Sequence, residues 1–124
     1  MNEAPAIQVL TQRIATSELQ RIVEAWFGDM AKYVVDIRLG HIAIGGDLHA
    51  DAEQILIEAG SRQEDLWGAN YYPGRGRDAC IEFTSLINIR PAIGNSTMEI
   101  ENESVKQQVR RITFDLIGEG EAFA

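Results

Sequence analysis

Apolar residues recur with helical spacing in three parts of the chain. Between residues 19 and 30 the apolar positions follow one another at intervals of three and four, which predicts a continuous stripe on a helix that begins near Ser17. Shorter patterns of the same kind cover residues 51–59 and 102–118. A glycine follows or closes each of these two patterns, as is typical of a helix C-terminus. The sequence therefore predicts three amphipathic helices.

Other segments have the composition or the alternation of β-strands. The runs 33–38 and 41–45 are rich in β-branched residues and are separated by Leu-Gly, which predicts a hairpin. Residues 66–72 form a further predicted strand that ends at a proline. Apolar and polar residues alternate over 81–90, so we expect a strand with one buried and one polar face there. A weaker signal at 7–11 predicts an edge strand.

The order of these elements indicates the fold class. Strands occur in hairpins and do not alternate singly with helices, so we expect an α+β fold with an antiparallel or mixed sheet and about three helices packed mainly on one face. We divide the chain into an N-terminal segment, 1–16, with the edge strand, a single α+β domain, 17–118, and a C-terminal tail, 119–124.

Composition narrows the class of protein further. The chain has 124 residues, of which 45% are hydrophobic and 24% charged, values typical of one globular domain. A net charge of −8 argues against nucleic acid as a partner, because a phosphate backbone binds basic surfaces. There is no apolar run of membrane-spanning length and no basic leader. Cys80 is the single cysteine, as expected in a reducing compartment, so we predict a cytoplasmic protein without membrane partners.

Three separated motifs resemble a known family. They are Gly-Gly-Asp-Leu-His-Ala-Asp at 45–51, Gly-Ser-Arg-Gln-Glu-Asp-Leu-Trp-Gly-Ala-Asn at 60–70, and Ser-Leu-Ile-Asn-Ile-Arg-Pro at 85–91 with Asn95. The chain resembles an uncharacterised family of small prokaryotic proteins that is catalogued only as a domain of unknown function, over roughly residues 17–118. The resemblance implies a prokaryotic, soluble, single-domain protein and assigns no activity to any residue.

The first motif contains a group of potential ligands. Asp47, His49 and Asp51 are spaced two apart, and in extended backbone they would lie on one side of the chain. Carboxylates with an imidazole suit a divalent metal or a catalytic base. The spacing matches no zinc signature, and Asp51 with Gln54 has the spacing of a helix capping box. We favour the capping interpretation and predict neither a metal nor a cofactor.

The second motif contains an aromatic residue between polar ones. Trp67 can stack on a planar ligand while Asn70 binds the edge of that ligand, with Asp65 nearby. Burial of Trp67 in the core is the favoured alternative.

The third motif places two polar residues on one face of a predicted strand end. Arg90 can bind a carboxylate or phosphate in a bidentate manner, and Asn88 can orient it beside the loop that carries Asn95. Alternatively the same residues form an internal clamp, in which Arg90 pairs with Asp47 or Asp65 and Asn88 binds loop carbonyls. The sequence favours neither interpretation.

These clusters support three functions. A small chain whose hairpin edges need covering predicts a ligand-binding or interaction module that acts as a homo-oligomer, with a small anionic ligand. A small hydrolase or lyase acting on an anionic substrate, with His49 as base and metal assistance, is the alternative. An antitoxin-like regulator is a second alternative that the acidic charge disfavours. The candidate pocket comprises Asp47, His49, Asp51, Asp65, Trp67, Asn70, Asn88, Arg90 and Asn95.

Overall fold

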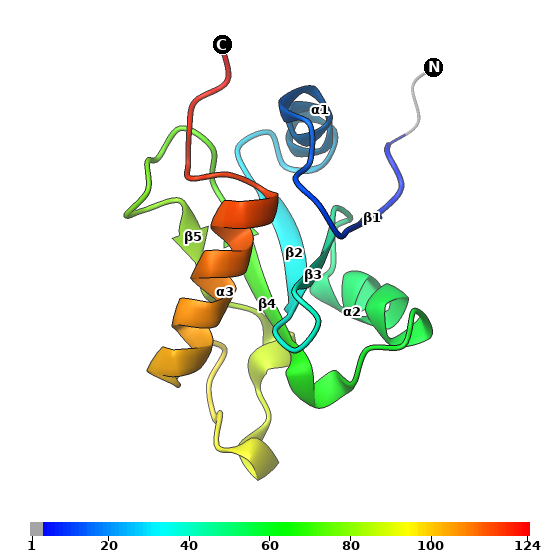
Figure 1. Ribbon diagram of the computed structural model, residues 1–124, viewed down its shortest axis with the longest axis vertical. Helices are drawn as coiled ribbons and strands as arrows, with labels where there is room; N and C mark the ends of the chain where they lie inside the picture. The colour runs from blue at the N-terminus through cyan, green and yellow to red at the C-terminus, as the bar shows by residue number, and fades with distance from the viewer. Residues whose placement is uncertain (1–3) are drawn as a thin grey trace.

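An antiparallel sheet forms the centre of the molecule (Figure 1). Within residues 4–124, which the computed structural model describes, the sheet has five strands in the spatial order β1-β3-β2-β4-β5. All neighbouring strands are antiparallel, and β2 and β3 form the predicted hairpin. The strands are β1 (Gln8–Leu10), β2 (Ala31–Asp36), β3 (His41–Ile44), β4 (Leu66–Tyr71) and β5 (Ile81–Glu82).

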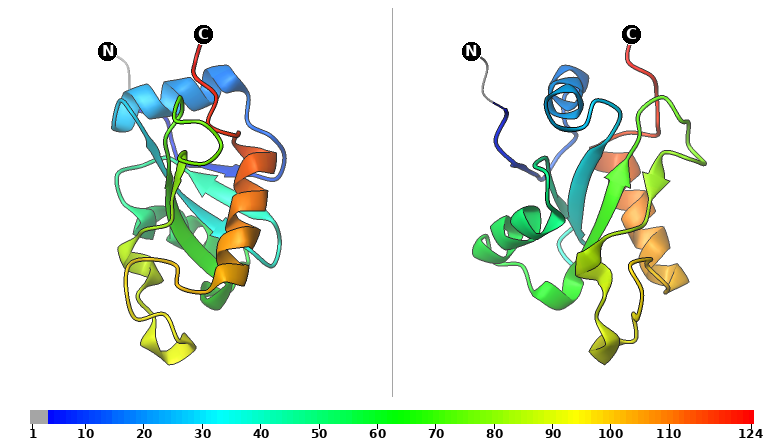
Figure 2. Two further views of the ribbon diagram at one scale, coloured as in Figure 1. Left: turned by 90° about the vertical axis from the view of Figure 1, so that its left-hand side faces the viewer. Right: turned by 180° about the vertical axis from the view of Figure 1, so that it is seen from behind.

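The α-helices of the described residues are α1 (Thr16–Trp26), α2 (His49–Glu58) and α3 (Glu103–Leu116). Helices α2 and α3 lie on opposite sides of the sheet, and α1 crosses one end of it (Figures 1 and 2). This arrangement confirms the predicted α+β class. None of the helices between residues 4 and 124 is long and apolar enough to cross a membrane.

Side chains alternate between two apolar clusters on the two faces of the sheet. On β2, Tyr33 and Val35 belong to the larger cluster and Val34 belongs to the smaller one, as the period of two requires. The smaller cluster contains Ala52 and Leu56 of α2. The α1 and α3 side chains buried in the larger cluster are Leu19, Ile22, Val23, Val109, Ile112 and Leu116.

The helix predicted over 102–118 is confirmed as α3, whereas α1 begins at a different residue from the one predicted. The Asn102 side chain caps α3 by accepting a hydrogen bond from the Val105 N–H at 3.0 Å. Helix α1 begins at Thr16, one residue before Ser17, near which its start was expected, and no side chain caps it.

The strand predicted over 81–90 is wrong beyond its first two residues. The chain leaves the sheet after Glu82 and forms 3₁₀ turns at Leu86–Asn88 and Pro91–Ile93; this region projects past the end of the sheet (Figure 1, yellow). The expected alternation is reversed at its far end, because Asn88 is fully buried and Ile89 is 41% exposed.

The Asn88 side chain explains this reversal, because it replaces the missing strand. Its Oδ1 accepts from the Gly68 N–H at 2.8 Å, and its Nδ2 donates to the Gly68 carbonyl at 3.0 Å. The two bonds imitate a strand pair on the edge of β4, where β5 no longer reaches. The same Nδ2 donates to the Met98 carbonyl at 3.1 Å, which fixes the returning loop.

Gly68 is required for this close approach. A Cβ atom at position 68 would lie 2.6 Å from the Ser85 Cβ and 3.1 Å from a side-chain carbon of Ile87. The segment that follows β5 can therefore pack directly on the β4 backbone only because residue 68 has no side chain.

Replacing Asn88 by aspartate tests this clamp. In Asn88→Asp the buried side chain keeps its shape but cannot donate, so the Gly68 and Met98 carbonyls lose their partner. We expect the free energy of unfolding, measured by urea denaturation, to fall by about 3 kcal/mol. Asn102→Asp is the matched control, since aspartate caps a helix as well as asparagine does. Equal stability of the two variants would contradict the assigned role.

Candidate functional site

A groove of about 420 Å³ opens on the α2 face of the sheet, within the range of roughly 300–1,000 Å³ typical of small-molecule sites. We call it the sheet groove. Its floor is formed by polar side chains from three strands, from the residue that follows β4 and from α2, and its rim by apolar side chains of the loops. The floor residues are Lys32, His49, Asn70, Tyr72 and Glu82.

Strand register aligns three of the floor residues. Lys32 of β2 is directly opposite Asn70 of β4, and Asn70 is directly opposite Glu82 of β5. Residues paired in this way project from the same face of a sheet. The floor therefore carries a row of ammonium, amide and carboxylate groups.

Asn70 occupies the centre of this row with one half of its amide unpaired. Its Nδ2 donates to Glu82 Oε1 at 2.7 Å. Its Oδ1 is buried and has no hydrogen-bond partner among residues 4–124, in a residue that is only 7% exposed. A buried acceptor without a donor is uncommon in folded proteins and marks a position that a ligand can satisfy.

His49 adds a second acceptor beside Asn70. Its Nε2 lies 2.8 Å from the Ala69 carbonyl; a carbonyl can only accept, so Nε2 carries the proton. In the neutral ring Nδ1 then presents a lone pair. Burial lowers the His49 pKa and nearby Lys32 acts in the same direction, while the hydrogen bond between the ring and the Ala69 carbonyl opposes them.

The rim of the sheet groove is apolar and exposed. Leu48, Leu86 and Met98 are 54%, 71% and 41% exposed, and all three line the groove. Large apolar side chains gathered around a polar floor are typical of a binding surface.

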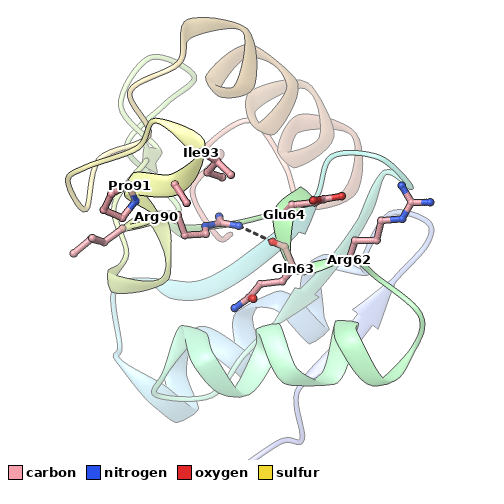
Figure 3. A pocket seen from close by; sticks show the side chains of 8 residues that line it. Arg62, Gln63, Glu64, Arg90, Pro91 and Ile93 are labelled. Atoms are coloured by element: carbon pink, nitrogen blue, oxygen red, sulfur yellow. Dashed lines mark hydrogen bonds between the residues drawn. The ribbon is translucent and has the colours of Figure 1, made fainter.

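A second, wider cavity of about 620 Å³ lies beside the 3₁₀ turn Gln63–Asp65 (Figure 3). Arg90 projects into this cavity, but its side chain is bound by other residues of the same chain. Its guanidinium donates to the Gln63 carbonyl at 2.5 Å and to the Leu66 carbonyl, and it stacks 4.5 Å from the centre of the Trp67 ring. Arg90 thus clamps the start of β4, with backbone carbonyls as partners in place of the expected Asp47 or Asp65.

Asp65 and Asn95 of the second and third motifs also have internal partners, and Trp67 is buried. Asp65 pairs with Arg38 at 3.1 Å, and Trp67 is 5% exposed within the core. Asn95 is buried, and its Nδ2 donates to the carbonyls of Asn88, Thr97 and Glu99.

The three potential ligands of the first motif do not face a common site. Asp47 and Asp51 are exposed whereas His49 is buried. The capping box predicted for Asp51 is wrong, because α2 begins two residues earlier and no side chain caps it. Over residues 4–124, no group of three or more His, Cys, Asp or Glu side chains is arranged to hold a metal ion.

Of the nine candidate residues, the sheet groove contains His49 and Asn70. Sequence reasoning missed Lys32 and Glu82, which complete the row. Lys32 lies one residue before the strand predicted at 33–38, and Glu82 lies on the polar face of the strand predicted over 81–90. Knowledge of the strand register would have identified both.

Comparisons with known proteins support the resemblance noted from the motifs. The profile of a family described as "Protein of unknown function (DUF5674)" matches residues 8–116. No curated protein matches the chain, and no solved structure does.

The lowered His49 pKa predicts a pH dependence of stability. Between its ordinary pKa of 6.5 and the lower folded value, the unfolded chain binds a proton that the folded chain does not. The free energy of unfolding should therefore fall as the pH decreases from about 7 to 5. His49→Gln keeps an N–H donor for Ala69 but does not titrate, so denaturation curves at several pH values should show a shallower dependence. An unchanged dependence would contradict this role of His49.

Proposed function

The chain belongs to DUF5674, a family of proteins of unknown function, and we propose from the geometry of the sheet groove that it is a binding module for a small amphipathic ligand. The ligand would place a polar N–H or O–H group on the floor and an apolar body against the rim.

The unpaired Asn70 Oδ1 is the observation that carries this proposal. A buried polar atom without a partner costs about 1–3 kcal/mol. A donor group on the ligand would remove that cost, and the neighbouring lone pair of neutral His49 offers a second acceptor to the same group.

The rim supplies the apolar part of the recognition. Leu48, Leu86 and Met98 are exposed around the groove, and covering apolar surface contributes about 25 cal/mol for each Å² removed from water. The polar floor then sets the orientation of the ligand.

This proposal is better supported than a hydrolase or lyase that grips an anionic substrate with Asn88 and Arg90. Asn88 uses its whole amide on backbone groups, and the guanidinium of Arg90 is drawn toward the Gln63 and Leu66 carbonyls, where both side chains hold the scaffold together. Beside the Lys32 ammonium, the floor of the sheet groove offers the Asn70 Oδ1 and His49 Nδ1 acceptors and the Glu82 carboxylate, which favour a ligand that donates.

We also propose that the second cavity joins two copies of the chain as a homo-oligomer. Ile89 and Ile93 are 41% and 49% exposed on the loop that forms one wall. Arg62 and Glu64 extend from the facing wall (Figure 3). A twofold axis would bring Arg62 of each copy toward Glu64 of the other and cover both isoleucines.

Matched neutral probes test the ligand proposal. We expect 3-methyl-1-butanol to shift amide NMR signals of the groove residues with a roughly millimolar Kd. Methyl isoamyl ether, which has no donor, should bind more weakly. Leu86→Asp should weaken binding of the alcohol, whereas Leu39→Asp, a similar change on the β2-β3 turn, should not. Shifts scattered over the surface, or equal binding of both probes, would contradict the proposal.

The oligomer is tested by light scattering. The wild-type protein should show a mass above the 13.8 kDa of one chain, and Ile93→Glu should lower it to that value because it buries a charge in the interface. Leu39→Glu is the control and should leave the mass unchanged. A wild-type protein of 13.8 kDa would refute the interface.

A further inference from the structure

We infer that the ligand of the sheet groove is a free α-amino acid with an apolar side chain. This inference rests on the proposed function and assigns the chemical class of the ligand. It follows from the order of the charges along the floor, where Lys32 and Glu82 lie on either side of Asn70.

Lys32 provides the positive end of the row. Its ammonium donates to the Asp47 carbonyl at 3.0 Å and lies 5.1 Å from the centre of the Phe27 ring. The carbonyl uses one of three N–H groups. The other two remain for a carboxylate, and the two contacts hold the otherwise flexible side chain at this end of the groove.

Glu82 provides the negative end. Its Oε1 accepts from Asn70 at 2.7 Å and from the Tyr72 hydroxyl at 3.4 Å, while its Oε2 makes no hydrogen bond within residues 4–124. These contacts orient the carboxylate and leave one oxygen for an ammonium group.

The spacing of the two charges suits a zwitterion. Two strand separations place the backbones of Lys32 and Glu82 about 9–10 Å apart, with Asn70 between them. An α-amino acid in this gap directs its carboxylate to Lys32 and its ammonium to Glu82. A second N–H of the same ammonium reaches Asn70 Oδ1, the unpaired acceptor.

The paired charges also discriminate against simpler ligands. A ligand with only a positive charge is attracted by Glu82 but repelled by Lys32. A ligand with only a negative charge is attracted by Lys32 but repelled by Glu82. A ligand with both charges in this order gains at both ends. Its apolar side chain then lies against Leu48, Leu86 and Met98 on the rim.

Three probes with the same branched body separate these contributions. Calorimetry with the intact chain should show that L-leucine binds at least about tenfold more tightly than leucinamide, which lacks the carboxylate, or 4-methylpentanoate, which lacks the ammonium. Lys32→Met should make leucine and leucinamide bind equally, and Glu82→Gln should do the same for leucine and 4-methylpentanoate. The controls Lys106→Met and Glu24→Gln should keep the tenfold preference.

The outcomes distinguish the two proposals. If leucinamide or 4-methylpentanoate binds as tightly as leucine, the zwitterion proposal is overturned while the binding module stands. If leucinamide binds more tightly than leucine, the zwitterion proposal is also overturned, and the N-terminus of a peptide is indicated as the ligand. If neither leucine nor 3-methyl-1-butanol shifts the NMR signals of the groove, the binding module itself fails. Amide spectra of each variant verify that it is folded.

Discussion

The antiparallel register of β2, β4 and β5 is the constraint on which the candidate site depends. It aligns Lys32, Asn70 and Glu82 across three strands that are distant in the chain. Because side chains alternate between faces, a slip of one residue in any strand would move its member of the row to the opposite face. The apolar residues that alternate with the row, Tyr33 among them, are buried in the larger cluster, so the core itself enforces the register.

The early end of β5 creates the walls of the sheet groove. Since the chain leaves the sheet after Glu82, the following loop is free to bring Leu86 and Met98 to the rim. The exposed edge of β4 that results is satisfied by the side chains of Asn88 and Arg90. Asn88 and Arg90, which the sequence offered as ligand-binding residues, thus stabilise the scaffold, and the groove forms beside them.

The floor of the groove holds one of the buried side-chain atoms that lack a hydrogen-bond partner within residues 4–124; the others are Trp26 Nε1, Glu53 Oε2, Trp67 Nε1 and Arg90 Nε. Asn95 and Asn88 use their amides fully on backbone groups, whereas Asn70 leaves an oxygen unpaired next to a histidine that burial keeps neutral. Such local exceptions to hydrogen-bond satisfaction are expected where a protein is built for a ligand, because the ligand completes the network.

The sequence by itself determined the α+β class, the three amphipathic helices and the β2-β3 hairpin, because each follows from a pattern of neighbouring residues. Only the tertiary structure decided that residues 83–90 leave the sheet and that Lys32 and Glu82 join His49 and Asn70 in one groove. The side chains of Asn88 and Arg90 illustrate the reason. Their partners are backbone groups about twenty residues away in the chain, and no local periodicity encodes a hydrogen bond or a strand register over that separation.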